Sequence, residues 1–249
     1  MDFQHPEDKP MFRRVYEGYR QTHYSTLQAI AKSVAFFAIL KLLINANRYI
    51  AVSDYTASFL ARRGMTRERI TVVGNGVDVA YINSIKANEK TYDGVFVGRI
   101  ARDKGIFDLI EAWKDVVEGR RDAKLLIIGS GPDSSAVNHE ITGSKTEGSI
   151  IAVGRCTDDE MCRLIKSSRV FVFPSRFEGW GMAVADALAC GLPVVCYDIP
   201  AIREVFGSCK SVFLVPPGDV GKLASTFQSA FDGEPLRAVK HLKGLRQRF

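Results

Sequence analysis

Short apolar runs rich in β-branched residues alternate with amphipathic windows through the second half of the 249-residue chain. Continuous apolar runs, each followed by helical periodicity, are typical of strands buried on both faces of a parallel sheet. We therefore expect a doubly wound, Rossmann-like α/β domain over residues 93–235, with ligands at the carboxyl ends of its strands. The runs are Val95–Val97, Leu125–Ile128, Ile150–Val153, Val170–Phe173, Val194–Cys196 and Val212–Val215.

Residues 1–82 follow a different pattern. Between residues 11 and 46 the composition favours helix, and apolar side chains three and four positions apart predict one buried helical face. A strand at Tyr49–Val52, a helix N-capped by Ser53 and a strand at Ile70–Val73 follow. Two strands are too few to bury the faces of a sheet, so we expect an incomplete, mostly helical portion of a second domain. The apolar helical positions are Leu27, Ile30, Val34, Phe37, Leu40 and Ile44.

Two further segments complete the expected organisation. The polar run 83–92 is predicted to be a linker, and residues 236–249 to be a basic C-terminal helix that is incomplete because it stops without a capping signal.

The longest apolar stretch, Val34–Ile44, is interrupted by Lys41 and is shorter than the roughly 20 residues of a spanning helix. We expect its helix to pack inside its domain, with a position on a membrane surface as the alternative.

The composition, with 46% hydrophobic and 25% charged residues, is globular and excludes a disordered tail or a fibre. The net charge of +6 suits phosphate-bearing ligands, an anionic membrane and nucleic acid equally. No aromatic-basic module is present, so nucleic-acid binding is not expected. Five cysteines without a C-x-x-C pair, and a polar start without a signal peptide, predict reduced core thiols and a cytoplasmic location. The cysteines are Cys156, Cys162, Cys190, Cys196 and Cys209.

The first candidate site is the segment Gly98–Gly105, between the first strand of the expected sheet and the helix that follows. Its glycines allow close backbone approach, the helix start presents unpaired N–H groups, and Arg99 and Lys104 add positive charge. This combination favours a diphosphate. The alternative is a solvated loop whose cations pair with Asp103 and Asp108. Neither the G-x-G-x-x-G nor the P-loop fingerprint occurs in this segment.

The second candidate site is Pro174–Met182, where another strand meets glycines and a helix start. Glu178 precedes the glycines, and Asp186 follows eight residues later. A carboxylate at an anion-attracting helix start is well suited to accept hydrogen bonds from sugar hydroxyls. The alternative is that Glu178 only stabilises the helix dipole, by about 0.3 to 1 kcal/mol.

These segments belong to a set of motifs that occurs in one order. The set comprises Gly98-Arg99 with Lys104-Gly105, Leu126–Pro132, Phe173–Ser175 leading to Glu178–Gly181, and Ala189–Val195. Together the motifs resemble the donor-binding domain of the GT-B fold retaining glycosyltransferases of family 4 (glycosyl transferases group 1), over most of Val95–Asp219. Upstream, Val52–Tyr55 and Gly74–Asp78 resemble the end of that family's acceptor-side domain and its crossover, which implies that residues 1–82 are part of a second Rossmann-like domain.

The resemblance implies that Arg99 and Lys104 hold the diphosphate of a nucleotide sugar, beside Gly98. It implies that Glu178 holds donor sugar hydroxyls and that Asp186 contacts the ribose. The family has an E-x7-E motif here, and Asp186 is shorter than its second Glu by one methylene. The resemblance also implies that backbone N–H groups face the sugar and β-phosphate and that one segment lies against the nucleobase. These groups belong to Gly179, Trp180, Gly181 and Met182 and to Gly154, Arg155 and Cys156, respectively.

His5 is placed where some relatives have a histidine that faces the donor sugar, which implies a catalytic role. The alternative is a histidine that is merely exposed near a terminus.

The implied activity is transfer of a hexose from a UDP- or GDP-sugar to a glycan, lipid-linked or other acceptor, with retention of anomeric configuration. The resemblance also implies that no cofactor and no metal are needed, and consistently no D-x-D triplet occurs. The main alternative is a truncated nucleotide-sugar-binding module that transfers nothing by itself and needs a missing acceptor-domain segment or a partner chain. A nucleotide-sugar epimerase of the same fold is a further alternative, against which the spacing of Glu178 and Asp186 argues. A peripheral membrane contact would accompany a lipid-linked acceptor.

Overall fold

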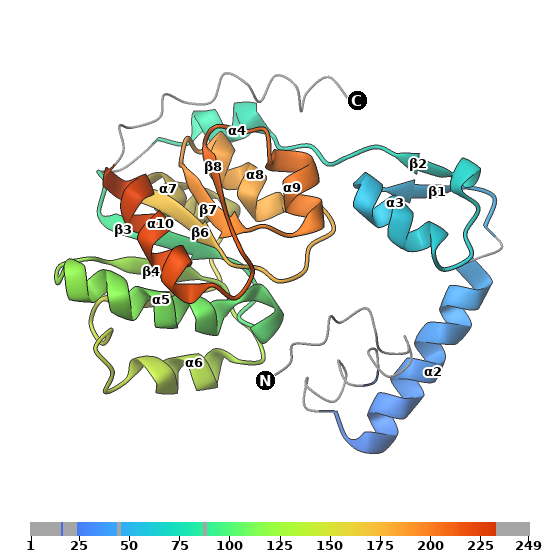
Figure 1. The fold of residues 1–249 in the computed structure, drawn as a ribbon, viewed down its shortest axis with the longest axis horizontal. Coiled ribbons are helices and arrows are strands. Elements are labelled where there is room, and N and C mark those ends of the chain that lie inside the picture. The colour runs from blue at the N-terminus through green and yellow to red at the C-terminus, as the bar shows by residue number, and fades with distance from the viewer. Residues whose placement is uncertain (1–15, 17–23, 44–45, 87–88, 233–249) are drawn as a thin grey trace. The chain divides into compact units, whose positions relative to one another are not determined.

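The computed structural model describes residues 16, 24–43, 46–86 and 89–232 of the chain (Figure 1). Two compact units are present: one within Met1–Ile50 and Phe59–Thr71, the other within Ala51–Ser58 and Val72–Phe249. His5 and the predicted basic helix at 236–249 lie outside the described residues.

The sheet of the larger unit contains six parallel strands in the order β5-β4-β3-β6-β7-β8. The first strand of this sheet along the chain, β3, is central; the chain runs outward to β5 on one side and then from β6 to β8 on the other. This is the strand order of a Rossmann-like fold, and the predicted doubly wound parallel sheet is confirmed. The strands are β3 (Tyr92–Val97), β4 (Leu125–Ile128), β5 (Ile150–Gly154), β6 (Ser168–Phe173), β7 (Val194–Tyr197) and β8 (Val212–Val215).

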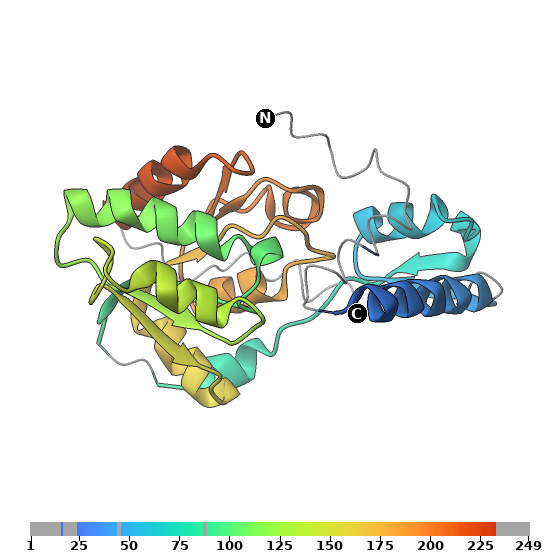
Figure 2. The same ribbon diagram turned by 90° about the horizontal axis from the view of Figure 1, so that it is seen from below.

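Helices cover both faces of this sheet, with α5 and α10 on one face and α7 and α8 on the other (Figure 2). On α5, buried side chains recur at helical spacing, and Trp113 packs edge-on against Phe227 of α10 with ring centroids 5.0 Å apart. The indole N–H of Trp113 donates to Ser149 Oγ at 3.0 Å, so its burial leaves no unpaired donor. The helices are α4 (Val79–Ser84), α5 (Ile106–Gly119), α6 (Ser134–Ile141), α7 (Asp158–Lys166), α8 (Met182–Ala189), α9 (Pro200–Phe206) and α10 (Val220–Asp232).

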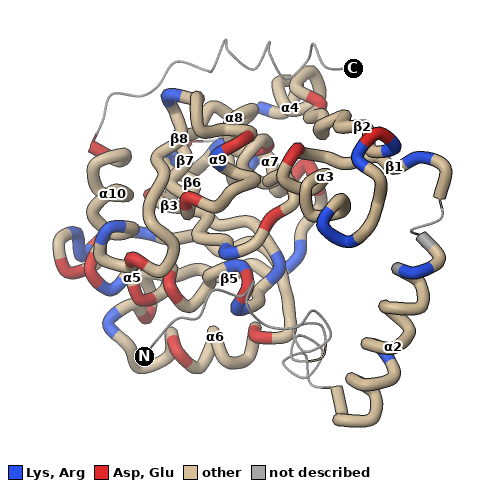
Figure 3. Tube along the Cα trace, turned by 45° about the vertical axis from the view of Figure 1, so that its right-hand side comes forward, with Lys and Arg blue, Asp and Glu red and all other residues tan. Residues whose placement is uncertain are grey.

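The outer surface of α5 and α6 carries both signs of charge (Figure 3). Lys114 Nζ donates to Glu111 Oε2 at 2.6 Å within α5 and to Glu140 Oε1 of α6 at 3.1 Å. Exposed pairs of this kind contribute at most about 1 kcal/mol each. The two helices are therefore held mainly by their apolar faces, and their polar faces remain solvated.

The smaller unit has few elements. Its helix α2 spans Thr26–Leu43, close to the predicted helix, and β1 (Tyr49–Ala51) pairs with β2 (Ile70–Val72) in a two-stranded sheet. Between β1 and β2 along the chain lie α3 (Asp54–Ala61), which begins within the Ala51–Ser58 segment of the larger unit, and the 3-10 turn η2 (Arg67–Arg69). Ser53 N-caps α3 as predicted, because its Oγ accepts a hydrogen bond from the Thr56 N–H at 3.0 Å.

The prediction that α2 buries its apolar face is wrong. Leu27 is 81% exposed and Val34 56% exposed, whereas the buried positions are the small residues Ala29 and Ser33. The described residues of this unit supply only a two-stranded sheet and short helices, which is too little surface to cover the large side chains. The exposed apolar side chains of α2 are distributed around the helix, whereas a helix lying on a membrane surface has a distinct polar face. Within the described ranges, no helix combines the length and hydropathy needed to cross a bilayer.

Helix α4 overlaps the predicted linker 83–92 and is absent from the elements predicted from the sequence. Its N-cap is Asp78, whose Oδ1 accepts a hydrogen bond from the Tyr81 N–H at 2.9 Å. An aspartate before a short apolar segment is an ordinary N-cap signal and could have identified the helix. At the other end of the predicted linker, Tyr92 is already part of β3.

Gly105 shows how closely the segments after β3 and β6 approach one another. Its φ is +69°, and a Cβ added there would lie 1.9 Å from the carbonyl oxygen of Pro174. The backbones are also hydrogen-bonded, since the Arg176 N–H donates to Asp103 O at 2.9 Å. The two segments are therefore joined at the backbone level, and only glycine is accommodated at this position.

We predict that Gly105→Ala destabilises the protein more than Gly143→Ala. Both glycines have positive φ, +69° and +72°, so both substitutions carry a backbone cost of about 1 kcal/mol. No atom lies within 4 Å of a Cβ built on Gly143, so only Gly105→Ala adds a steric overlap. The free energy of unfolding measured in urea should fall by about 1 to 3 kcal/mol more for Gly105→Ala. Equal losses would contradict the close contact with Pro174.

Candidate functional site

A cavity of about 380 Å³ opens at the carboxyl ends of β3 and β6. These neighbouring strands are the point where the strand order of the sheet reverses, which is where open α/β sheets bind ligands. The volume is within the range of small-molecule sites. Of the predicted site residues, those that line the cavity are Gly98, Lys104, Glu178, Gly179, Trp180, Gly181 and Met182.

Lys104 and Glu178 form an ion pair in this cavity. Lys104 comes from the segment after β3 and Glu178 from the segment after β6, and Lys104 Nζ lies 2.6 Å from Glu178 Oε1. Their side chains are only 21% and 14% exposed. Because both charges are largely shielded from water, removal of either partner would leave the other uncompensated. The pair brings together the two segments that the sequence analysis singled out.

Arg99 lies outside the cavity lining and is held by a neighbour. Its Nη2 donates to both Asp103 carboxylate oxygens, at 2.9 and 2.7 Å, and both side chains are nearly half exposed. In the ligand-free structure, Arg99 therefore pairs with Asp103 of its own loop, which was the predicted alternative to a diphosphate site. Asp108 instead accepts a hydrogen bond from Arg176 at 2.6 Å and from the Tyr197 hydroxyl at 2.8 Å.

Two helices begin beside the cavity without side-chain caps. The residues before α5 and α8 are Gly105 and Gly181, and neither helix start has a capping hydrogen bond from its N-cap residue. Free N–H groups and the positive end of the helix dipole attract anions at such positions. Gly181 has φ +105°, and a Cβ there would lie 2.5 Å from Ile202 Cδ1, so glycine also allows α9 to pack here.

Gly154, Arg155 and Cys156 lie at the end of β5 and outside the cavity lining. Gly154 O accepts a hydrogen bond from the Gly129 N–H at 2.7 Å, and Arg155 Nε donates to Ser130 Oγ at 2.8 Å. A Cβ on Gly129 would in turn lie 1.9 Å from Gly98 O. The ends of β5, β4 and β3 thus form one continuous row that leads to the cavity.

Asp186 lies on α8, one turn beyond the helix start, and does not line the cavity. Burial raises the pKa of its carboxyl to about 6, and the negative charge of Asp158 on α7 adds to the increase. Asp186 is therefore partly protonated near neutral pH in the ligand-free protein.

The cavity also contains residues that the sequence analysis did not assign to the site. Asn75 follows Gly74 in the predicted crossover segment Gly74–Asp78, but a turn signal alone does not show where its side chain lies. The segment Ala51–Ser58 belongs to the compact unit that contains the six-stranded sheet and the cavity. Within it, Ser53 Oγ and Thr56 Oγ1 both donate to Gly179 O, at 2.6 and 3.1 Å. The unassigned lining residues are Val52, Asn75, Val97, Phe173 and Ala183.

The remaining chemistry-bearing residues lie elsewhere. All five cysteines are free; Cys162 and Cys196 are buried, whereas Cys156, Cys190 and Cys209 are half-buried. Burial raises the pKa of the Cys190 thiol to about 12. Among the described residues, no group of three or more His, Cys, Asp or Glu side chains is arranged to hold a metal ion.

Comparisons with protein families match both parts of the chain. Residues 80–241 match the model of "Glycosyl transferases group 1", and residues 10–81 match that of "Glycosyltransferase Family 4". A 2-deoxystreptamine glucosyltransferase of Streptomyces kanamyceticus is 26% identical over 61% of the chain and 39% of its own length. The capsular polysaccharide biosynthesis glycosyltransferase CapM of Staphylococcus aureus is 26% identical over 77% of the chain and 54% of its own length. The chain thus spans about half or less of these relatives.

Solved structures with a similar fold include two that hold uridine nucleotides. A variant of S. aureus TarM, in complex with fondaparinux, alpha-GlcNAc-glycerol and UDP, has a TM-score of 0.70 at 20% identity, covering 91% of this chain and 44% of TarM. Anabaena HepE, in complex with UDP and glucose, has a TM-score of 0.68 at 20% identity, covering 78% of this chain and 57% of HepE. At this identity the likeness concerns the fold, which is that of the GT-B glycosyltransferases.

We predict that Asp186→Asn stabilises the protein at pH 7 to 8 but not at pH 4. The folded-state pKa of about 6 is above the ordinary value of 3.8, so the folded state favours the protonated carboxyl. Relative to a pH below about 4, where Asp186 is largely protonated in both the folded and the unfolded state, the wild-type protein therefore loses stability as the pH rises through 6 and the buried carboxyl must ionise. The gain for the variant at neutral pH is at most about 3 kcal/mol.

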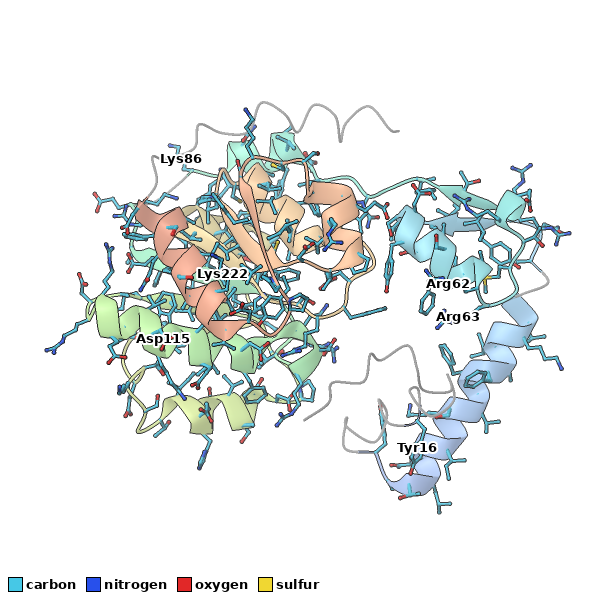
Figure 4. All side chains as sticks on the ribbon, viewed as in Figure 1. Tyr16, Arg62, Arg63, Lys86, Asp115 and Lys222 are labelled. Carbon is cyan, nitrogen blue, oxygen red and sulfur yellow. The ribbon has the colours of Figure 1, made fainter. Side chains whose placement is uncertain are left out.

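Thermal unfolding from pH 4 to 8 tests this prediction. Asp115→Asn is the matched control, because Asp115 projects from α5 as an exposed side chain (Figure 4). A difference between wild type and Asp186→Asn that does not vary with pH would contradict a raised pKa.

Proposed function

Because the chain belongs to the glycosyl transferases group 1 family, we propose that it binds a nucleoside-diphosphate sugar in the cavity between β3 and β6 and takes part in sugar transfer. The observation that carries the proposal is the Lys104–Glu178 pair, which places a cation for phosphate and a carboxylate for sugar hydroxyls on one cavity wall. The donor is a UDP- or GDP-hexose, and the acceptor is a saccharide or a lipid-linked glycan.

The two charges are proposed to contact different parts of the donor. In the proposed complex, Lys104 turns from Glu178 to the diphosphate, and Arg99 exchanges Asp103 for a phosphate oxygen. The uncapped starts of α5 and α8 add N–H groups near the same charge. Glu178 then accepts hydrogen bonds from the donor sugar.

The proposed chemistry depends on stabilising the departing diphosphate. As the bond between the anomeric carbon and the phosphate oxygen breaks, negative charge develops on the leaving group. Preorganised cations and N–H groups lower the energy of that charge without reorganising at the moment of reaction. Retention of anomeric configuration follows from the resemblance to the retaining family. We further assign the ribose to Asp186, the nucleobase to Gly154–Cys156 and a contact with the donor sugar to His5.

A second candidate function is donor binding without transfer by this chain alone. The exposed apolar side chains of α2 and the small sheet favour it, because the described residues of the smaller unit form only two paired strands and leave large apolar side chains uncovered. Product formation by the isolated chain distinguishes the two functions, since both predict nucleotide-sugar binding.

We predict selective thermal stabilisation by one family of nucleotides. A ligand that binds only the folded state at a hundredfold excess over its dissociation constant stabilises by about 2.7 kcal/mol. The melting temperature should therefore rise with either uridine or guanosine diphosphate and its sugars in a panel that also contains adenosine compounds. A flat response across the whole panel would remove the support for a donor site.

We predict that Arg99→Ala and Lys104→Ala each reduce turnover by the equivalent of about 3 kcal/mol, because each removes a charge that stabilises the leaving group. Arg102→Ala is the matched control. Arg102 is an arginine of the same loop that is 71% exposed and lies 4.0 Å from Asp133. Transfer rates measured at saturating donor should fall only for the first two variants. A similar small effect for all three would argue against the assignment.

A further inference from the structure

Two hydrogen-bond donors meet on one oxygen of Glu178. Lys104 Nζ lies 2.6 Å and Ser175 Oγ lies 2.8 Å from Glu178 Oε1. No hydrogen bond from the described residues reaches Glu178 Oε2. The carboxylate that lines the cavity therefore has one oxygen satisfied by the protein and one that remains open.

Ser175 is sealed inside the protein. The residue is only 1% exposed, so water cannot take the place of its hydroxyl. Two carbonyl oxygens also lie near Ser175 Oγ, that of Phe177 at 3.2 Å and that of Asp103 at 3.5 Å, but Glu178 Oε1 is the closest acceptor. The hydroxyl proton is therefore directed to the carboxylate, which carries the full negative charge.

The backbone around Ser175 is held in place by the segment after β3. The N–H of the next residue, Arg176, donates to Asp103 O at 2.9 Å, and the Arg176 guanidinium pairs with Asp108 of α5 at 2.6 Å. These contacts fix the position of the serine hydroxyl independently of Lys104. Ser175 can thus remain on Glu178 Oε1 when Lys104 leaves it.

This arrangement matters because the terminal torsion of a glutamate is broad, so a single contact does not fix the plane of the carboxylate. If Lys104 turned toward a diphosphate and no second donor were present, Glu178 Oε1 would be left without a partner in a shielded place. Unpaired charged acceptors of this kind are costly.

We propose that Ser175 is a positioning residue of the donor-sugar site. Resting on the proposed function, it keeps Glu178 Oε1 occupied while Lys104 contacts the diphosphate, so that Oε2 is presented to a sugar hydroxyl. Ser175 itself does not touch the donor. As a consequence, the protein prefers the nucleotide sugar over the bare diphosphate. This preference depends on the Ser175 hydroxyl, which is buried and lies outside the cavity lining.

Isothermal titration of the whole chain with UDP and with UDP-glucose tests the proposal, with GDP and GDP-mannose as the second pair. For Ser175→Ala we expect the ratio of the dissociation constant of the nucleotide sugar to that of the bare diphosphate to rise about tenfold or more, the size expected for a hydrogen bond to a charged group, because only the sugar needs an oriented Oε2. The ratio of the two constants is measured within each protein. A partly unfolded variant lowers the number of binding sites and leaves this ratio intact.

Ser168→Ala is the matched control. Ser168 is fully buried at the opposite end of β6, and its Oγ donates to Leu164 O at 2.9 Å. This variant also loses a buried serine hydroxyl, at the start of the strand that Ser175 follows, and should keep the wild-type ratio. In a Glu178→Ala background, the effect of Ser175→Ala on the ratio should disappear, because its partner is gone.

Two results would overturn the proposal. Equal weakening of nucleotide and nucleotide sugar by Ser175→Ala would mean that the hydroxyl does not orient Glu178 toward the sugar. A change of ratio that persists without Glu178 would mean that Ser175 acts by another route. Failure of the wild-type chain to bind any member of either pair is a different result, because it refutes the proposed function itself.

Discussion

Lys104 and Glu178 meet because the sheet places β3 beside β6. The two strands are separated in the chain by two complete strand–helix units, yet they are hydrogen-bonded neighbours with their carboxyl ends at the same edge. Every other feature of the cavity depends on this adjacency. It brings Gly105 against Pro174, joins Arg176 to Asp103 and lets a lysine from one corner reach a glutamate from the other. A different strand order would leave two ordinary loops with uncapped helices.

The electrostatics of the ligand-free site are self-contained. Arg99 is paired with Asp103 and Lys104 with Glu178. In the proposed function, a bound diphosphate replaces a carboxylate as the partner of each cation, so the cations are never left without a counter-charge. The site is then prepared for an anion without holding an uncompensated positive charge, which would be costly for the shielded Lys104. The raised pKa of Asp186 shows the opposite case, a carboxyl for which the ligand-free protein supplies burial and a like charge but no cation.

The smaller unit shows what helical periodicity alone does not determine. The apolar side chains of α2 recur at helical spacing, yet the helix packs through Ala29 and Ser33 and exposes Leu27 and Val34. Spacing defines which residues share a face, but burial requires another surface of sufficient extent. Among the described residues of this unit, two short strands do not provide it.

The sequence by itself determined most of the local elements. β-Branched runs set the strands of the parallel sheet, glycines marked the corners after β3 and β6, and Ser53 identified the start of α3, because strand burial, backbone freedom and capping are read over a few neighbouring residues. Only the tertiary structure decided that Lys104, and not Arg99, reaches Glu178, that Asn75 lines the cavity, and that the buried Ser175 holds one oxygen of that glutamate. These contacts join residues far apart in the chain, and their geometry depends on strand order and side-chain direction, which spacing along a sequence does not record.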